Sequence, residues 1–248
     1  MLILKFACLN NRDVIEARIS DHDPLFVDTP YGRVCYFNMM CQGSGKNNAY
    51  KQIENLNEYK ARLEKIIHVL KEIQNKYLVA GFMLQESPNL NSRTQEEKDV
   101  ANYFYTELKN QLTNFQVAPV SFSRKTFNTR SCMFSTFDKT IFPIQTATVY
   151  SAKEGREQEI KLTDKKGNSV TAINVHGDHA KQSETASFII QSAKSGSIVG
   201  GDLNITNGTQ EALNLVCVLQ AIPKANVNLT QARNFKTLDI AVCTLAKK

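Results

Sequence analysis

Four apolar runs in this chain each end at polar residues that a buried strand does not need. The runs are RVCYF, AGFMLQ, TAINV and SIVGG, and they lead respectively to Asn38, to Glu86, to His176, and to Asp202 with Asn204. Continuous apolar runs of this length are typical of strands that are buried on both faces in a layered α/β protein. Strand ends are rigid points from which loops diverge, so polar side chains there favour an assembled site.

The rest of the chain predicts an α/β protein with a mixed sheet system. A helix is expected near 50–77, because apolar residues recur there every three or four positions. A second is expected near 95–113, where Thr94 and Glu97 form a plausible capping box, and others around 186–190 and near 209–220. The DKKGN segment at 164–168 predicts a hairpin turn between two strands. Strands outnumber helices, and hairpins occur beside buried runs, so a purely parallel sheet is not expected.

Length and composition are those of an ordinary globular protein. The 248 residues fit a single domain that spans 1–248, and 42% of them are hydrophobic while 22% are charged. No stretch approaches the roughly 20 apolar residues of a membrane span. The six cysteines form no CxxC pair, which argues against a zinc ribbon and favours reduced thiols. With no secretory signal at the start, we expect a cytoplasmic protein and leave non-classical export open.

The residue types at the strand ends favour phosphoester chemistry with a hard metal ion. Carboxylate and amide oxygens are the ligands that Mg²⁺ prefers, and Mn²⁺ is the alternative ion. Many zinc sites contain cysteine, and no cysteine belongs to this set. His176 adds a group that titrates near neutral pH. Each residue also has an ordinary reading on its own: a turn asparagine at Asn38, a core histidine at His176, and an Asx turn at Asp202.

Taken together, these segments resemble the motifs of one known family. YFNMMCQG, FMLQES, AINVHGDHAKQSETASFIIQ and IVGGDLN resemble, in this order, segments of the endonuclease/exonuclease/phosphatase superfamily, and the resemblance covers about 33–243. It implies a four-layer α/β sandwich with two mixed β-sheets packed face to face and helices outside. It also implies a phosphoesterase site at one end of the two sheets.

The resemblance gives each strand-end residue a role. Glu86 would be the principal metal ligand, and Asn38 would lie beside the metal. His176 would contact the phosphate. Asp202 would activate or orient the attacking water, and Asn204 would orient that water and contact the phosphate.

The end of the chain departs from the family pattern. Family members carry an aspartate on a penultimate strand and then a last strand that begins Ser-Asp-His, with a histidine central to catalysis. This chain ends KTLDIAVCTLAKK, in which Asp239 matches the penultimate aspartate or, less well, the Ser-Asp-His aspartate. In either alignment no histidine follows Asp239, so we expect the terminal catalytic histidine to be absent. His179 is an exposed-loop candidate for partial substitution.

The predicted function is therefore a Mg²⁺-dependent phosphoester hydrolase of phosphodiesterase or nuclease type. The missing histidine leaves open a catalytically impaired binding protein on the same fold. A phosphoinositide or sphingolipid phosphoesterase is a further alternative, as is an interaction protein whose motifs are accidental.

The predicted substrate is a phosphoester, with nucleic acid favoured over phospholipid. The formal net charge of +6 suits an acidic partner. Candidate phosphate contacts are Lys46, in a glycine-rich loop, and the basic residues of SRKTFNTR, namely Arg124, Lys125 and Arg130. We expect a monomer with no transmembrane segment.

Overall fold

The structure is a computed structural model, and it describes residues 20, 22–40, 55–92, 94–116, 131–149, 156–231 and 237–245. Four helices are described: α2 (Leu56–Tyr77), α3 (Gln95–Gln111), α4 (Gln182–Lys194) and α5 (Gln210–Ala221), with a short 3₁₀ turn, η2 (His179–Lys181). The strands are β1 (Leu25–Thr29), β2 (Gly32–Asn38), β3 (Gly81–Pro88), β4 (Ser131–Phe137), β5 (Ile144–Val149), β6 (Glu157–Thr163), β7 (Ser169–His176), β8 (Ile198–Thr206), β9 (Asn226–Gln231) and β10 (Thr237–Cys243).

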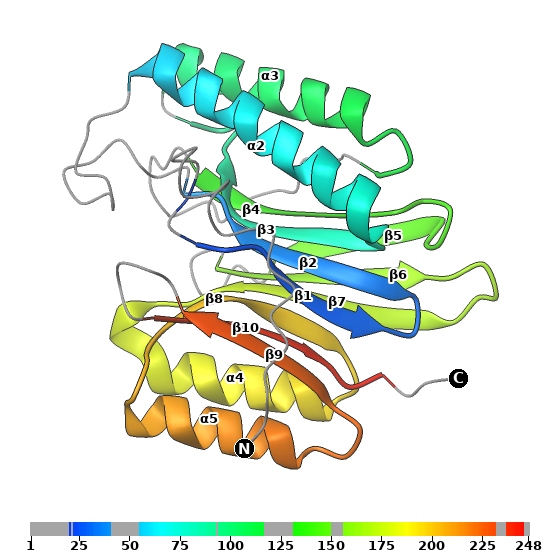
Figure 1. Cartoon of the computed structure of the whole chain (residues 1–248), viewed down its shortest axis with the longest axis vertical. Coiled ribbons are helices and arrows are strands. Elements are labelled where there is room, and N and C mark those ends of the chain that lie inside the picture. The colour runs from blue at the N-terminus through cyan, green and yellow to red at the C-terminus, as the bar shows by residue number, and fades with distance from the viewer. Residues whose placement is uncertain are drawn as a thin grey trace.

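These strands form two mixed sheets that lie face to face (Figure 1). The smaller sheet has the order β1-β2-β3-β4, and the larger has the order β5-β6-β7-β8-β10-β9. Each sheet contains one parallel pair, β2 with β3 and β7 with β8, among antiparallel neighbours. Helices α2 and α3 cover the outer face of the smaller sheet, and α4 and α5 cover that of the larger (Figure 1). The four-layer sandwich predicted from the sequence is confirmed.

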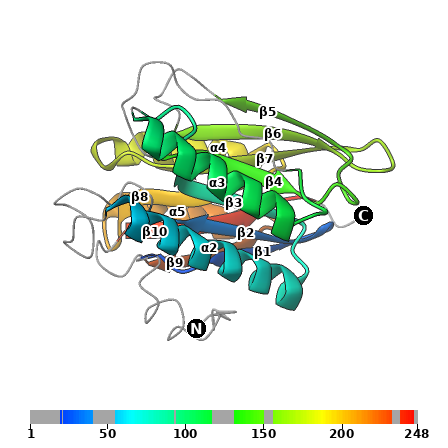
Figure 2. The ribbon, with the colours of Figure 1, turned by 90° about the horizontal axis from the view of Figure 1, so that it is seen from above.

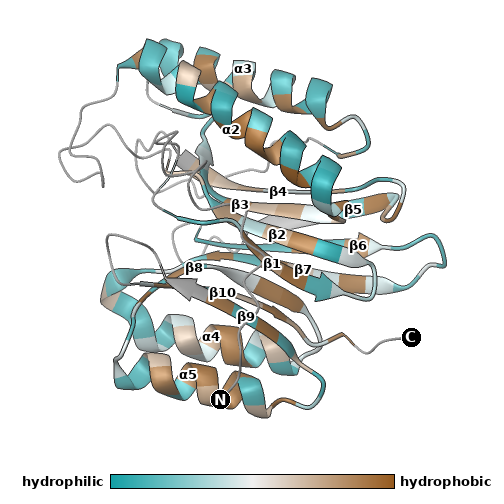
Figure 3. Ribbon diagram, in the orientation of Figure 1, coloured by the Kyte–Doolittle hydropathy of each residue, from teal (hydrophilic) through white to brown (hydrophobic). Residues whose placement is uncertain are grey.

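Three apolar layers hold the four structural layers together. One lies between the smaller sheet and α2 with α3, a second between the two sheets, and a third between the larger sheet and α4 with α5. The helices turn their hydrophobic stripes towards the sheets and their hydrophilic stripes outward (Figure 3). Seen from above, α2 and α3 run side by side over the smaller sheet (Figure 2).

The longest helix shows how the sequence sets its bounds. Asn55 caps α2, since its side chain accepts from the amides of Asn57 and Glu58, and the Glu58 carboxylate accepts from the Asn55 amide in return. The helix ends at Tyr77, because the left-handed backbone of Leu78 (φ 48°) stops the α-helical repeat. The predicted end at residue 77 is confirmed, whereas the cap at Asn55 makes the helix begin at Leu56, later than the predicted start near residue 50. Residues 50–54 lie outside the described residues.

Two strands were not predicted. β1 is a short strand at the edge of the smaller sheet, and β9 lies at the edge of the larger sheet. In LFVDT the apolar residues are consecutive and few, whereas NVNLTQ does alternate polar with apolar residues, a strand signal that the sequence analysis did not use. None of the described helices has the length and apolar character that crossing a bilayer requires.

Candidate active site

Strand alternation places the predicted site residues on the facing surfaces of the two sheets. Successive side chains of a strand point to opposite faces. In β10, Leu238 and Ile240 pack in the layer under α4 and α5, whereas Ala241 packs between the sheets. Asp239 therefore belongs to the inner face. The same alternation puts Asn38 of β2, His176 of β7 and Asp202 of β8 on the inner faces, where all are at most 9% exposed.

A bulge in β3 determines the position of Glu86. Leu84 pairs with Phe134 and Ser87 pairs with Cys132, so β3 contains one more residue than β4 between these two pairs. Glu86 has a left-handed backbone, with φ 51°. Gln85 already occupies the inner face, so a regular strand would turn Glu86 towards the helices. With the bulge, its carboxylate reaches the site instead and its side chain is 13% exposed.

A second irregularity positions Asn204. Asp202 and Ile205 pair with neighbouring residues of β10, so Leu203 and Asn204 fall outside the regular pairing. Asn204 also has a left-handed backbone, with φ 51°, and its side-chain amide donates to the Gly177 carbonyl at 2.9 Å. Non-glycine residues in this region of φ cost about 1–3 kcal/mol each and cluster at functional sites. The site ends of β3 and β8 thus each carry a non-glycine residue with a left-handed backbone, Glu86 and Asn204.

Gly201 explains why glycine precedes Asp202. Its φ of 140° is rarely adopted by other residues, and a Cβ atom there would lie 1.9 Å from the Val175 carbonyl oxygen. The glycine lets β8 approach β7 closely, where His176 pairs with Asp202 in parallel register. The two side chains are consequently neighbours at the same end of the larger sheet.

The side chains meet in a compact cluster of carboxylates, amide and imidazole. Asn38 Nδ2 donates to Asp202 Oδ2 at 2.9 Å and lies 3.4 Å from Glu86 Oε1. His176 Nε2 lies 3.5 Å from Glu86 Oε1 and 3.7 Å from Asp202 Oδ2. Asn38 therefore bridges the two carboxylates with its amide nitrogen, while its oxygen accepts from the Met40 amide at 2.8 Å. This geometry gives Asn38 the position of an orienting donor for both carboxylates.

The structure supplies a histidine for Asp239, so the expectation that Asp239 has no histidine partner was wrong. His22 Nδ1 lies 3.0 Å from Asp239 Oδ2, and His22 Nε2 lies 3.7 Å from Asp202 Oδ2. The imidazole is buried, with 6% of the side chain exposed. Ser20 fixes this segment, because its hydroxyl donates to the Asn38 carbonyl at 2.7 Å and accepts from the His22 amide at 3.1 Å.

The sequence did contain a signal for this histidine. Residues 20–22 read Ser-Asp-His, the tripeptide expected at the start of the family's last strand, but they occur near the beginning of this chain. They lead into β1, which pairs antiparallel with β2. His22 and Asp239 are 217 residues apart in sequence. The motif stands at the opposite end of the chain from its place in the family pattern. His179, an exposed residue of η2, need not substitute for the missing histidine.

Burial lowers the pKa of His176 below its usual 6.5 because the imidazolium form is poorly solvated there. Glu86 and Asp202 oppose that effect, while Arg156 and His22 add to it. His176 is therefore neutral at neutral pH, and it does not balance the charge of the adjacent carboxylates.

These donors fit a divalent cation. Glu86 and Asp202 are largely buried, they share the same two neighbours, and buried like charges are costly unless a cation compensates them. His22, Asp202 and Asp239 also offer ligand atoms within 4.8 Å of one another. A set rich in carboxylate oxygens, with no described cysteine among them, suits Mg²⁺ or Mn²⁺. The identity of the ion and the ligand roles stay predictions.

A buried amide bridge ties the two sheets together directly behind the cluster. Gln85 Nε2 donates to Asn174 Oδ1 at 2.5 Å and to the Met83 carbonyl at 3.1 Å. Asn174 Nδ2 in turn donates to the Leu84 carbonyl and to Ser135 Oγ, both at 3.1 Å. Gln85 precedes Glu86, and Asn174 lies two residues before His176. The bridge therefore fixes the spacing of the strands that carry these two site residues.

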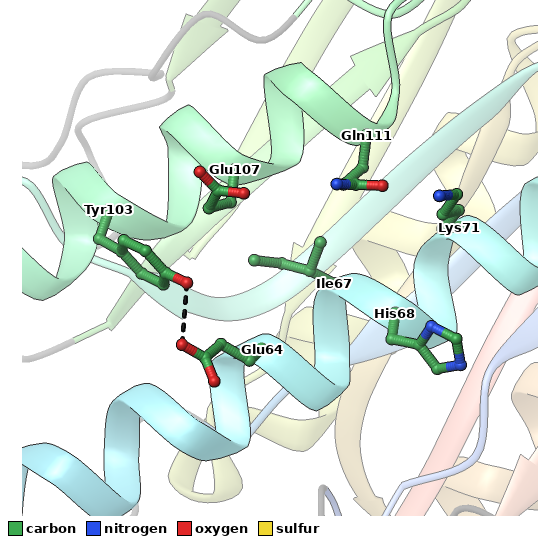
Figure 4. A pocket seen from close by; sticks show the side chains of 7 residues that line it. All are labelled: Glu64, Ile67, His68, Lys71, Tyr103, Glu107 and Gln111. Carbon is green, nitrogen blue, oxygen red and sulfur yellow. Dashed lines mark hydrogen bonds between the residues drawn. The ribbon is translucent and has the colours of Figure 1, made fainter.

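The predicted phosphate contacts Lys46, Arg124, Lys125 and Arg130 lie outside the described residues. A separate hollow of about 210 Å³ lies between α2 and α3, away from the sheets' inner faces (Figure 4). It is lined by Glu64, Ile67, His68, Lys71, Tyr103, Glu107 and Gln111, and Tyr103 donates to Glu64 at 2.8 Å. It contains no group of converging metal ligands like that of the cluster, within the part of the chain described here.

Comparison with solved structures identifies the fold. Zebrafish (D. rerio) TDP2, in complex with a single-stranded DNA product, superposes with a TM-score of 0.51 at 10% identity, over 87% of this chain and 84% of that one. ANGEL2, a 2′,3′-cyclic phosphatase, gives a TM-score of 0.50 at 12% identity, over 72% of this chain and 54% of that one. The chain has the endonuclease/exonuclease/phosphatase fold.

A family protein from Bacteroides thetaiotaomicron matches less closely, with a TM-score of 0.47 at 10% identity, over 73% of each chain. No family model matches the sequence, and no curated protein matches it either. At this level of identity the endonuclease/exonuclease/phosphatase likeness concerns the fold. What the site does has to be argued from its own residues.

Proposed function

We propose that this chain is a phosphoester hydrolase that requires a divalent metal ion. The observation that carries the proposal is the His22–Asp239 hydrogen bond, which sets an imidazole beside Asp202 at the point where Glu86, His176 and Asn38 converge. The binding-protein alternative depended on the absence of that histidine. Its presence favours an enzyme.

The His22 pair has the geometry of an oriented acid–base group. Asp239 accepts the Nδ1 proton, an assignment that follows from the hydrogen bond, and this leaves Nε2 facing Asp202. Nε2 can then take a proton from an attacking water or return one to a leaving oxygen. In hydrolysis a water oxygen bonds to phosphorus while the ester P–O bond breaks. The water loses a proton and the leaving oxygen gains one, so Nε2 can serve both transfers.

The remaining residues bind and orient. We assign orientation of the water to Asp202, and contact with the phosphoryl oxygens to His176 and Asn204. Glu86 is the principal ligand for the metal, with Asn38 holding its carboxylate in place. When bound, the metal would polarise the phosphoryl group and offset its charge.

Nucleic acid is the substrate class that we favour. The positive net charge supports it, as does the fold shared with TDP2, which was solved with a single-stranded DNA product. Phosphoinositides and sphingomyelin remain alternatives that one assay can separate.

The test is hydrolysis with Mg²⁺ or Mn²⁺ of single-stranded DNA, plasmid DNA, single-stranded RNA, phosphoinositides and sphingomyelin. We expect turnover of a nucleic acid that is abolished by EDTA and by Asp202→Ala. Asp28→Ala is the matched control, because Asp28 is an exposed aspartate whose carboxylate pairs with Arg33 at 2.8 Å. If folded native protein shows no turnover above Asp202→Ala on any substrate, the proposal is wrong.

A further inference from the structure

Arg156 is held against the loop that follows His176. The residue directly precedes β6, and its carbonyl oxygen accepts from the His176 amide at 2.8 Å. Its guanidinium Nη1 donates to the Gly177 carbonyl at 2.7 Å. Both its main chain and its side chain are thus fixed beside a site residue.

The guanidinium shares its acceptor with Asn204. Asn204 Nδ2 donates to the same Gly177 carbonyl oxygen at 2.9 Å. β6 and β8 flank β7 in the larger sheet, so the two donors approach this oxygen from opposite neighbours of one strand. Residue 177 must be glycine here, since a Cβ atom would lie 1.9 Å from the Leu203 carbonyl oxygen.

The Arg156 guanidinium has N–H donors beyond the one that contacts Gly177, and no carboxylate pairs with it among the described residues. A guanidinium carries five N–H donors in a planar fork, and the Gly177 contact uses one of its nitrogens. The residue is only partly exposed. Its contacts with Gly177 and with the main chain of His176, and the acceptor that it shares with Asn204, place a fixed and incompletely used guanidinium where an oxyanion can bind.

We propose that Arg156 binds a non-bridging phosphoryl oxygen of the substrate, next to His176 and Asn204. The inference rests on the proposed function and extends it, since it names a phosphate contact on the scaffold itself. Because Nη1 is held by the Gly177 carbonyl, the remaining N–H donors of the guanidinium are fixed in direction and can donate to that oxygen.

The test measures binding of inorganic phosphate by calorimetry in the presence of Mg²⁺, and hydrolysis of bis(4-nitrophenyl) phosphate. The variants are Arg156→Gln, whose amide can still donate to Gly177, and Arg156→Lys, which keeps the charge. Arg33→Gln is the matched control, because Arg33 is also partly exposed and its guanidinium pairs with Asp28 at 2.8 Å, not with any residue of the site. We expect Arg156→Gln to weaken phosphate binding and raise KM by about 10- to 100-fold, with an unchanged melting temperature.

The outcomes separate this inference from the proposed function. Partial recovery in Arg156→Lys would support a charge-dependent contact. If the native enzyme turns over and binds phosphate, and Arg156→Gln behaves identically, the inference alone is overturned. If the folded native protein neither binds phosphate nor hydrolyses any ester, the proposed function falls and the inference falls with it.

Discussion

The space between the two sheets has one end packed with apolar side chains and another that holds buried polar groups. At the apolar end, Val27, Val34, Met83, Phe137 and Ile198 fill the layer. Further along the same strands, the inner-face positions are taken by the carboxylates, imidazoles and amides of the site. β2, β3, β7, β8 and β10 supply both ends.

The same strands therefore serve stability at one end and chemistry at the other. The apolar end gains free energy from burial, at roughly 25 cal/mol per Å² of apolar surface. The polar end buries like charges and two residues with left-handed backbones, each of which costs free energy. The well-packed end therefore supports the strained one, and mutations at the two ends should have opposite signatures.

The largest expected effect is on turnover at the polar end. His22→Gln should lower kcat by roughly 10²–10⁴-fold with little loss of stability, because it removes the acid–base group that Asp239 orients. Asp239→Asn should act through the same imidazole, so the double variant should be little worse than either single one. Steady-state kinetics on the substrate found in the panel measure this. His179→Gln, an exposed histidine, is the control, and a near-native kcat in His22→Gln would contradict the role of His22.

The apolar end should show the reverse signature. Phe137 is fully buried and packs edge-on against Phe142 at 5.8 Å between ring centroids. Phe137→Ala should lower the free energy of unfolding by about 3–5 kcal/mol because it leaves a cavity. Urea unfolding measures the loss. The fraction that remains folded should keep its kcat, and a selective loss of kcat in folded protein would show that the two ends are not separable.

The amide bridge lies at the boundary between the ends and should show a mixed signature. Gln85→Leu alone or Asn174→Leu alone leaves buried polar partners unsatisfied and should cost about 1–3 kcal/mol of unfolding free energy. The double variant should recover part of that loss, since both partners become apolar. It should not recover activity if the bridge positions Glu86 and His176. A double-mutant cycle that is additive in stability would argue against a coupled pair.

The smallest effect is a pH dependence of stability in metal-free protein. The pKa of His176 is lowered in the folded state by burial, so the unfolded chain takes up the proton first as the pH falls below 6.5. Unfolding free energy should therefore decrease as the pH falls below this value, by at most about 1.4 kcal/mol per pH unit. His176→Gln should flatten that slope and His68→Gln, an exposed histidine, should not. Equal slopes in native protein and His176→Gln would refute the assignment.

Much of the site could be predicted from the sequence. Asn38, Glu86, His176, Asp202, Asn204 and Asp239 were named from the strand ends and motifs, and the structure brings all six together. The four layers were implied by the family resemblance, whereas periodicity and turn signals predicted an α/β protein and most of its elements. The roles of these residues in catalysis stay predictions until they are measured.

The features of the site that can be derived from the sequence alone are local. A period of two along a strand determines which side chains share a face. An apolar run followed by a carboxylate indicates where that face changes from apolar packing to polar site residues. The tertiary structure decided that His22, at the start of the chain, meets Asp239 near its end, and that a bulge turns Glu86 inward. The physical reason is that pairing across 217 residues depends on sheet order and on the packing of two sheets, which no local pattern encodes.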